Sequence, residues 1–353
     1  MTSWYDVASC VADNLVIGPG QAITVRDRAG RPDALAALTD AISARGATVA
    51  VESMTNEELL QILGDDERMS DWLEDRRATA AHTHAVVVLT GLPLNECTDD
   101  RGLLALWDDA RAVIDGTAEA RGVPLLLAAT PTTDLAATLG VSLADLDALV
   151  LPALVTPPSE LAQLARRYID MLESDPLVLE TPGCSLELRR GNRPWLVDDG
   201  ALSDEDRRAR ATVVNLPAGV IYATVLEEAS YGSVRLHELA GVSDVVLTFA
   251  EGRVEGIECA EGGDPIRRLF AEHVGEPRRV AYISIGINAA LNRRLRWPLV
   301  DEHQAGAVLL SLGDNLYLGG SNGSSLNADA ISVTPTLRAG GQTIVREGGL
   351  VTI

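Results

Sequence analysis

The chain contains no lysine: all 29 basic residues are arginine, against 51 acidic residues, and the formal net charge is −22. Enzymes that form a Schiff base through lysine, such as pyridoxal-phosphate enzymes and lysine-dependent aldolases, are therefore excluded. A Walker-type phosphate loop is excluded for the same reason. Because nucleic acids and anionic membranes attract proteins through basic patches, we expect neither of them as a partner of this acidic chain.

Cysteines and long apolar runs are also scarce. The cysteines Cys10, Cys97, Cys184 and Cys259 are far apart and form no C-x-x-C pair, so we expect neither a disulfide framework nor a structural zinc site. No run approaches the roughly 20 apolar residues that span a bilayer. The opening residues, MTSWYDVASCVADN, lack the pattern of a signal peptide, so we expect a cytoplasmic protein.

Short apolar runs alternate with helical patterns through the first half of the chain. Strands are expected at 22–27, 47–54, 84–91 and 123–130, with helices at 31–47, 55–77, 101–122 and 159–174. Thr55 and Glu58 have the spacing of a capping box at the start of the second helix. This β-α-β order predicts an α/β domain with a parallel sheet over residues 1–180.

Hairpin patterns replace this alternation from about Pro176 onward. Hairpins are expected within 184–197, around Gly191-Asn192, within 244–260, around Glu251-Gly252, and within 334–353, with one helix at 264–275 between them. The sequence therefore predicts a second domain over 181–353, of α+β class and rich in antiparallel strands.

Four segments of the second half occur in an order and spacing typical of one family. They are NLPAG (Asn215–Gly219), SIGIN (Ser284–Asn288), DEHQAGAVLLSLGDN (Asp301–Asn315) and NADAISVTPTL (Asn327–Leu337). With these segments the chain resembles the aminopeptidase T-type metallopeptidases, and resembles even more their ring-cleaving branch, the 2,5-dihydroxypyridine dioxygenases. The resemblance covers nearly the whole chain, and it implies a homo-oligomer.

The resemblance also implies where metal ligands would lie. Val220 and Tyr282 stand where the family typically has Glu, Leu309 stands where it has His, and Asn327 and Asp329 stand where it has a His-x-Asp pair. Only Asp329 keeps a ligand. One carboxylate with one amide does not hold zinc or iron tightly, and valine and leucine donate nothing. We therefore expect no metal and no cofactor.

The same positions suggest side-chain chemistry on a small-molecule substrate. Asp329 would act as base, Asn327 as amide donor to a carbonyl or oxyanion, and Tyr282 as acid or orienting hydroxyl. The alternative is a hydrogen-bond network that fills an abandoned cavity. Glu228, which follows IYATVL, is a further candidate acid or base, although an exposed loop carboxylate is an equal alternative.

Four further residues are predicted to bind the substrate. Tyr231 lies close to Glu228 in sequence, Asn315 and Tyr317 lie in the segment SLGDNLYLGG, and His303 stands where the family usually has lysine. His303 would carry a proton near the pocket, with a surface turn as the alternative.

Three hypotheses of function remain open at this point. The first is a metal-independent enzyme that acts on a small organic molecule by elimination, cyclisation, isomerisation or hydrolysis. The second is a non-catalytic protein that binds a ligand or a partner. The third is a metallopeptidase or ring-cleaving dioxygenase with relocated ligands, drawn from His303, Glu302 or Glu228.

Overall fold

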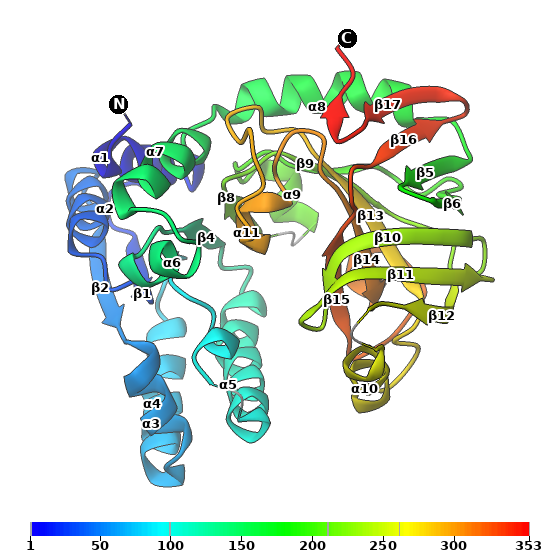
Figure 1. Ribbon diagram of the computed structural model, residues 1–353. Helices are drawn as coiled ribbons and strands as arrows, with labels where there is room; N and C mark the ends of the chain where they lie inside the picture. The colour runs from blue at the N-terminus through cyan, green and yellow to red at the C-terminus, as the bar shows by residue number, and fades with distance from the viewer. Residues whose placement is uncertain (1, 99, 210–211, 261, 353) are drawn as a thin grey trace. The chain divides into compact units, whose positions relative to one another are not determined.

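The computed structural model describes residues 2–98, 100–209, 212–260 and 262–352, which form two compact units (Figure 1). The first unit comprises Met1–Pro158 and Gly200–Ala218. The second comprises Ser159–Asp199 and Gly219–Ile353.

The sequence predicts a single boundary at residue 180, and the contacts divide the chain differently. The segment Gly200–Ala218 returns to the first unit because its strand β8 (Val213–Leu216) pairs in parallel with β4 (Leu125–Ala129), where Leu125 lies opposite Val213. The short apolar pattern of β8 is the same for a strand at the edge of a parallel sheet and for a strand of an antiparallel sheet, so the sequence of β8 does not show which sheet it joins.

Parallel strands form the sheet of the first unit, called sheet A, in the order β2-β1-β3-β4-β8. The strands before β4 are β1 (Ala22–Asp27), β2 (Thr48–Ser53) and β3 (Ala85–Thr90). Val25, Val87 and Leu126 are fully buried in this sheet, as expected for strands that are covered on both faces. The predicted α/β class is confirmed.

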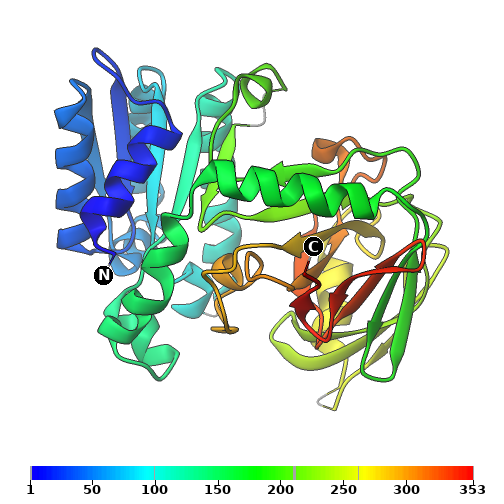
Figure 2. The same cartoon turned by 90° about the horizontal axis from the view of Figure 1, so that it is seen from above.

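Helices connect and cover these strands. They are α1 (Trp4–Asn14), α2 (Pro32–Ala44), α3 (Asn56–Leu63), α4 (Asp66–Ala80), η1 (Leu94–Glu96), α5 (Arg101–Glu119), α6 (Thr133–Thr138), α7 (Leu143–Leu154) and α9 (Asp204–Ala209). Figure 2 shows α2 alongside sheet A, where it packs on β1 and β2.

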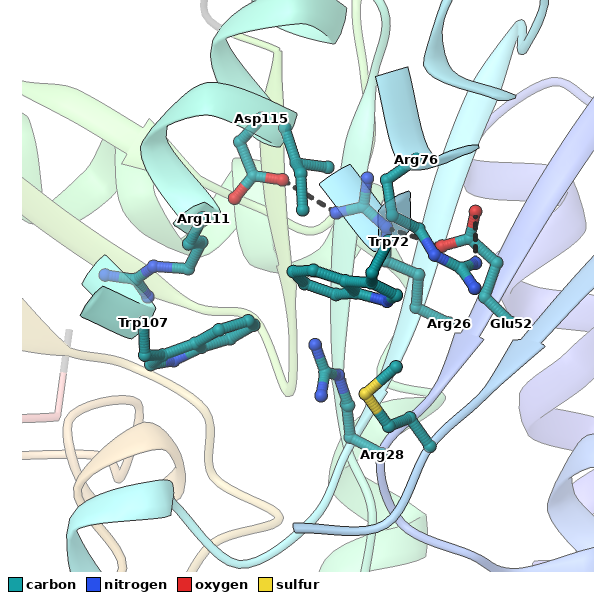
Figure 3. A pocket seen from close by; sticks show the side chains of 10 residues that line it. Arg26, Arg28, Glu52, Trp72, Arg76, Trp107, Arg111 and Asp115 are labelled. Atoms are coloured by element: carbon teal, nitrogen blue, oxygen red, sulfur yellow. Dashed lines mark hydrogen bonds and ion pairs between the residues drawn. The ribbon is translucent and has the colours of Figure 1, made fainter. Parts of the chain in front are cut away.

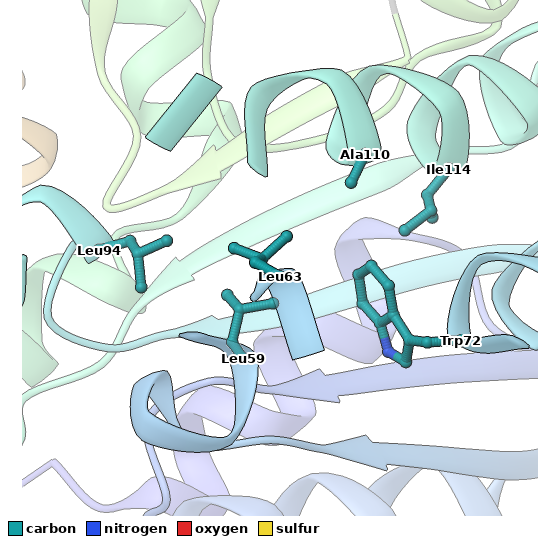
Figure 4. Packing of buried hydrophobic residues seen from close by; sticks show 6 residues of the cluster. All are labelled: Leu59, Leu63, Trp72, Leu94, Ala110 and Ile114. Atoms are coloured by element: carbon teal, nitrogen blue, oxygen red, sulfur yellow. The ribbon is translucent and has the colours of Figure 1, made fainter. Parts of the chain in front are cut away.

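One predicted helix, at 55–77, is in fact two. The capping box is present, since Thr55 Oγ1 accepts the Glu58 N–H at 3.1 Å and the Glu58 carboxylate accepts the Thr55 N–H at 2.9 Å. The helix nevertheless ends at Leu63, because Asp65 caps a new helix by accepting the N–H groups of Glu67 and Arg68. Residues of α3, α4, η1 and α5 then pack into a common apolar cluster: Leu59, Leu63, Trp72, Leu94, Ala110 and Ile114 (Figure 4).

Two antiparallel sheets make up most of the second unit, which confirms the predicted class of this part. Sheet B has the order β12-β11-β10-β6-β5-β16-β17-β18, and sheet C has the order β15-β14-β13-β9-β7. The strands of sheet B are β5 (Leu177–Thr181), β6 (Cys184–Leu188), β10 (Tyr231–Leu239), β11 (Val242–Ala250), β12 (Arg253–Glu258), β16 (Thr336–Ala339), β17 (Gln342–Arg346) and β18 (Gly349–Leu350). Those of sheet C are β7 (Leu196–Asp198), β9 (Val220–Thr224), β13 (Val280–Gly286), β14 (Val308–Gly313) and β15 (Asn327–Ile331).

The remaining elements of this unit are helical. They are α8 (Pro158–Leu172), the long green helix of Figures 1 and 2, α10 (Asp264–Glu272), α11 (Pro298–Asp301) and η2 (Leu316–Leu318). Across the described ranges, no helix is both long and apolar enough to cross a membrane.

The predicted hairpins fare differently. The hairpin that turns at Glu251-Gly252 and the hairpin within 334–353 are confirmed, because β11 pairs with β12 and β16 with β17. The hairpin at Gly191-Asn192 is wrong, since β6 lies in sheet B and β7 pairs with β9 in sheet C. The chain changes sheets at this turn, which local turn chemistry does not reveal.

Candidate active site

The register of sheet C gathers the predicted site positions on one face. Directly opposed residues of an antiparallel pair share a face, as does every second residue of a strand. Tyr282, Ser284 and Gly286 therefore share a face of β13. Val220 lies opposite Gly286 on β9, and Leu309 lies opposite Ser284 on β14.

The same face continues onto β15. Ser311 and Gly313 follow Leu309 at alternate positions on β14; Asp329 lies opposite Ser311, and Asn327 lies opposite Gly313. All positions that the family resemblance assigns to metal ligands thus lie on one surface of one sheet.

The other face of these strands fixes that orientation. Its residues are apolar and buried: Ile221, Ala223, Ile283, Ile285, Leu310 and Leu312. A slip of one residue in register would move these apolar side chains to the face of Asp329 and Tyr282, and would move Asp329 and Tyr282 into the apolar core. Burial of the apolar side chains therefore determines the direction in which Asp329 and Tyr282 point.

Tyr282 and Asp329 form the central contact of this face. The Tyr282 hydroxyl donates to Asp329 Oδ1 at 2.9 Å. Asp329 keeps solvent-accessible surface, yet the protein atoms crowded around it desolvate the carboxylate and raise its pKa, while the nearby hydroxyl groups of Ser311 and Tyr282 partly oppose this rise. Burial and the nearby charge of Asp329 hold the pKa of Tyr282 well above its ordinary value. The pair therefore places a hydroxyl group that keeps its proton beside a carboxylate that solvent can reach.

Asn327 lies beside this pair in a fixed orientation. Its Oδ1 accepts the Ser311 hydroxyl at 3.2 Å, and its Nδ2 donates to the Tyr317 hydroxyl oxygen at 3.4 Å. Burial and the charge of Asp329 raise the pKa of Tyr317 to about 12, so its hydroxyl keeps its proton at neutral pH. Because Tyr317 accepts from Asn327, its own proton is available to another oxygen.

His303 lies in a buried network next to this face. Its side chain is only 1% exposed; Nδ1 is 3.1 Å from the Leu299 carbonyl oxygen, and Nε2 is 4.0 Å from Asp198 Oδ2. Burial alone would lower the pKa of His303, but the carboxylates of Asp198 and Glu302 raise it overall. The ring of His303 is thus enclosed by neighbours of its own unit, and its predicted role in substrate binding stays a prediction.

Glu302 belongs to the same network and was considered from the sequence only as a relocated metal ligand. Burial raises its pKa to about 7; His303 opposes the rise, and the charges of Asp329 and Asp198 add to it. Its side chain keeps 25% exposure. The charge of Glu302 also contributes to the raised pKa of Tyr282, so the network and the pair are coupled electrostatically.

Glu227, the neighbour of the predicted Glu228, has a structural role. Its carboxylate accepts two hydrogen bonds from Arg193 Nη2, at 2.8 and 2.6 Å, one from the Ser321 N–H at 2.8 Å and one from Asn315 Nδ2 at 3.1 Å. Burial would raise the pKa of Glu227, but these hydrogen bonds lower it to about 2. Asn315, predicted to bind substrate, is fully buried and also donates to the Ala281 carbonyl at 3.2 Å.

The last two predicted residues lie elsewhere in the second unit. Glu228 is 79% exposed, with its carboxylate 3.8 Å from Arg279 Nη2. Tyr231 is 52% exposed on β10 of sheet B. The structure thus brings Asp329, Tyr282, Asn327 and Tyr317 together. Among the described residues, no hydrogen bond or ion pair links Glu228, Tyr231, Asn315 or His303 to that group.

The sequence analysis does not predict Ser311 or Asp198 as residues of the site. Strand alternation was a usable signal for Ser311, because it lies two residues after Leu309. Asp198 had no such signal, since it reaches this face through the pairing of β7 with β9. A third tyrosine, Tyr222, packs near Tyr282 with ring centroids 6.4 Å apart.

The residues of this face do not fit a zinc or iron centre. Val220 and Leu309 offer no donor atom, and Asp329 supplies the only carboxylate among the positions that the family resemblance assigns to metal ligands. Within the ranges that the structure describes, no group of three or more His, Cys, Asp or Glu side chains is arranged to hold a metal ion. The relocated set of His303, Glu302 and Glu228 is likewise not assembled there.

Solved structures share this fold over almost its full length. AmpT from Thermus thermophilus matches with a TM-score of 0.73 at 17% identity, covering 99% of each chain. The 2,5-dihydroxypyridine dioxygenase from Pseudomonas putida KT2440 matches with a TM-score of 0.63 at 14% identity, covering 99% of this chain and 97% of the other. No protein-family model and no curated protein matches the sequence. The resemblance inferred from the sequence is confirmed for the fold.

Proposed function

We propose that this protein is an enzyme that transforms a small organic molecule by acid–base chemistry on sheet C, without a metal ion. The observation that carries the proposal is the contact between Tyr282 and Asp329, an accessible carboxylate with a raised pKa beside a protonated hydroxyl. A base is most effective when its pKa approaches the working pH, and desolvation moves Asp329 in that direction.

The roles follow from the hydrogen bonds. Asp329 accepts a proton from a carbon, hydroxyl or water of the substrate. The Tyr317 hydroxyl and the Asn327 amide face developing negative charge on a substrate oxygen, because neither group loses its proton at neutral pH. Tyr282 holds Asp329 in place, and as it gives its proton to the product it takes up the proton that Asp329 accepted, so that both groups return to their starting state. Elimination, cyclisation, isomerisation and hydrolysis all proceed by such transfers.

The fold neighbours support a small substrate. One of them is named as a dioxygenase of 2,5-dihydroxypyridine, a compact ring compound. The Ser311–Asn327 and Tyr282–Asp329 bonds also pre-orient polar groups on one surface, which positions a small molecule better than a long chain. The cytoplasmic location and the homo-oligomeric state stay predictions.

Turnover by single-residue variants in the presence of a chelator tests the proposal. Small cyclic amides, hydroxypyridines and hydroxy ketones would be incubated with the protein and EDTA, with products followed by liquid chromatography and mass spectrometry. We expect Asp329→Asn to lower kcat by about 10²- to 10⁴-fold, the usual contribution of a general base. Tyr282→Phe should lower it less.

Matched changes at exposed sites provide the controls. Asp71→Asn and Tyr5→Phe make the same chemical changes on the first unit, where both side chains are exposed, and should leave turnover unchanged. Loss of turnover with EDTA would refute the metal-independent mechanism. Full activity of Asp329→Asn would refute the role of the carboxylate, and specific binding without turnover would favour the ligand-binding alternative.

A further inference from the structure

A recess in the first unit combines arginine and tryptophan side chains (Figure 3), and no residue of sheet C contributes to it. It lies at the carboxyl ends of β1 and β2, against α4 and α5. We call it the Arg28 recess. The residues that line it are Arg26, Arg28, Glu52, Met54, Trp72, Arg76, Trp107, Arg111, Ile114 and Asp115.

The topology of sheet A makes this a favoured place for a ligand. In the order β2-β1-β3-β4-β8, the chain moves from β1 to one side for β2 and to the other side for β3. Open parallel sheets bind ligands outside the carboxyl ends of their strands, at such a switch point. Arg28 lies at this point: it directly follows β1, and its N–H donates to the Leu89 carbonyl of β3 at 3.0 Å.

The loops after β1 and β3 approach each other closely here. A Cβ atom on Gly91 would lie 2.3 Å from the Arg28 carbonyl oxygen, so only glycine fits at that position. The backbone that carries Arg28 is therefore held by its neighbours, and the guanidinium is placed by a rigid part of the fold.

The other interior arginines of the recess are neutralised by carboxylates. Arg26 contacts Glu52 at 3.2 Å and Asp115 at 2.7 Å, and Arg76 contacts Glu52 at 2.8 Å. Figure 3 shows these ion pairs as dashed lines, none of which reaches Arg28. Glu52 and Asp115 act on Arg28 only through their charges, from a distance.

Arg28 has no hydrogen bond or ion pair to its side chain among the described residues. Its guanidinium carbon lies 4.6 Å from the centre of the Trp107 ring, and its Nη1 is buried without a partner. Burial together with Arg26 and Arg76 lowers the pKa of Arg28 to about 10, so the group stays charged at neutral pH. A buried charged donor without an acceptor is unfavourable, and a bound anion would satisfy it.

The remaining surfaces of the recess indicate what carries the anion. Met54, Trp72, Trp107 and Ile114 are apolar, and the two tryptophan rings lie 6.4 Å apart. The recess is partly open; its cavity volume is about 20 Å³, or about 330 Å³ when the space open to solvent is counted. A carboxylate head is small enough for the interior, and an apolar or aromatic body would lie toward the opening.

We propose that the Arg28 recess is a binding site for a small apolar or aromatic carboxylic acid, whose carboxylate pairs with Arg28 and whose body packs on Trp107 and Trp72. The guanidinium fork suits a planar carboxylate, and the ring face of Trp107 already orients it. This site is independent of the chemistry proposed for sheet C, so either proposal can fail alone.

Binding of simple probes to the full-length protein tests this site. Thermal unfolding and isothermal titration calorimetry would be recorded with benzoate, acetate, inorganic phosphate and benzyl alcohol, at constant ionic strength set with sodium chloride. We expect benzoate to bind at least 10-fold more tightly than acetate or phosphate, and benzyl alcohol to show no saturable binding. Equal binding of benzoate and benzyl alcohol would overturn the role of the charge, and equal binding of benzoate and phosphate would overturn the role of the apolar body.

Variants then locate the binding. Arg28→Gln should weaken benzoate binding at least 10-fold, and Arg28→Lys should weaken it less because the charge remains without the fork. Arg338→Gln, a change at a partly exposed position of sheet B outside the recess, is the control and should bind like the wild type. Unchanged affinity in Arg28→Gln would refute the site. If that variant does not fold, Trp107→Leu provides the same test, since loss of the ring should also weaken benzoate binding.

Discussion

Asp329 is the one carboxylate at the positions that the family resemblance assigns to metal ligands. At a metal centre a carboxylate acts as a ligand, whereas here its hydrogen-bond partner is the Tyr282 hydroxyl group. Neutral donors stabilise the charged form less than a cation does, and desolvation then dominates. The raised pKa that supports a base is thus a consequence of the desolvated surroundings of Asp329, which hold neutral donors and no cation.

Glu302 provides a test of this electrostatic environment at the level of one residue. Its carboxyl group ionises near 4.5 in the ordinary state, and burial raises its pKa to about 7 in the folded protein. Between these values the folded state keeps a proton that the unfolded chain has lost, so the free energy of unfolding falls as pH rises from 4.5 to 7. We expect Glu302→Gln to gain on the order of 2 kcal/mol relative to the wild type across this window.

Urea unfolding at pH 5 and pH 7.5 measures this difference. Glu238→Gln, at an exposed position of β10, is the matched control and should show the same offset from the wild type at both pH values. A pH-independent difference between Glu302→Gln and the wild type would show that the carboxyl group is not desolvated in the folded state.

At the level of elements, the family resemblance located positions within sheet C, whereas the pairing of its strands was not predictable from the sequence. The positions of Tyr282, Leu309, Asn327 and Asp329 follow from the family resemblance, and the structure places them on one face. Asp198 joins that neighbourhood only because β7 pairs with β9 across a long sequence separation. Local periodicity carries no information about such partners, which is why the turn at Gly191-Asn192 was misread as a hairpin.

Glu227 connects two separate segments of the second unit, and its replacement should weaken that connection. The carboxylate accepts from Arg193, Ser321 and Asn315, and its side chain is only 14% exposed. We expect Glu227→Gln to lower the free energy of unfolding by about 2–3 kcal/mol at pH 7, since charge-assisted bonds are lost and Arg193 is left without its charge partner. Urea unfolding measures the change.

The adjacent residue supplies the control for this prediction. Glu228→Gln makes the same change at a side chain that is 79% exposed, and should alter stability by no more than about 0.5 kcal/mol. Because the pKa of Glu227 is lowered to about 2, its contribution is present above its ordinary value of 4.5 and is lost as pH falls toward 2. The gap between Glu227→Gln and the wild type should therefore narrow over that range, and a constant gap would contradict the assignment.

At the level of the whole molecule, the sequence predicted the fold class of each half of the chain. It did not predict that a later segment returns to the first unit. Alternating apolar runs and helices indicated a parallel sheet, and turn-rich hairpins indicated antiparallel ones. The return of Gly200–Ala218 to the first unit depends on β8 finding the edge of β4, a contact between residues far apart in sequence. Likewise, the unpaired Arg28 has no sequence signature, because its isolation results from where Glu52 and Asp115 point.

The full-length fold match leads to the final prediction, which is that the backbone of sheet C can bind a metal ion when donor side chains are introduced. The backbone agrees with AmpT over 99% of both chains, while the ligand positions implied by the resemblance carry Val220, Tyr282, Leu309 and Asn327. If loss of donors alone removed the metal site, restoring them should restore binding. We expect the variant with Val220→Glu, Tyr282→Glu, Leu309→His and Asn327→His to retain about one zinc or manganese ion per chain after dialysis, as expected for a site with several carboxylate and imidazole ligands.

The wild-type protein treated in the same way should retain far less than one ion per chain, measured by plasma mass spectrometry. A variant with the same four changes and Asp329→Asn is the control, and it should bind the metal more weakly because the remaining original carboxylate is gone. Stoichiometric metal in the wild type would refute the loss of the site. A folded four-residue variant that binds no metal would contradict the prediction. It would show that the backbone of sheet C, and not only its side chains, differs from the arrangement that a metal requires. Ligand atoms misplaced by more than a few tenths of an ångström no longer coordinate together.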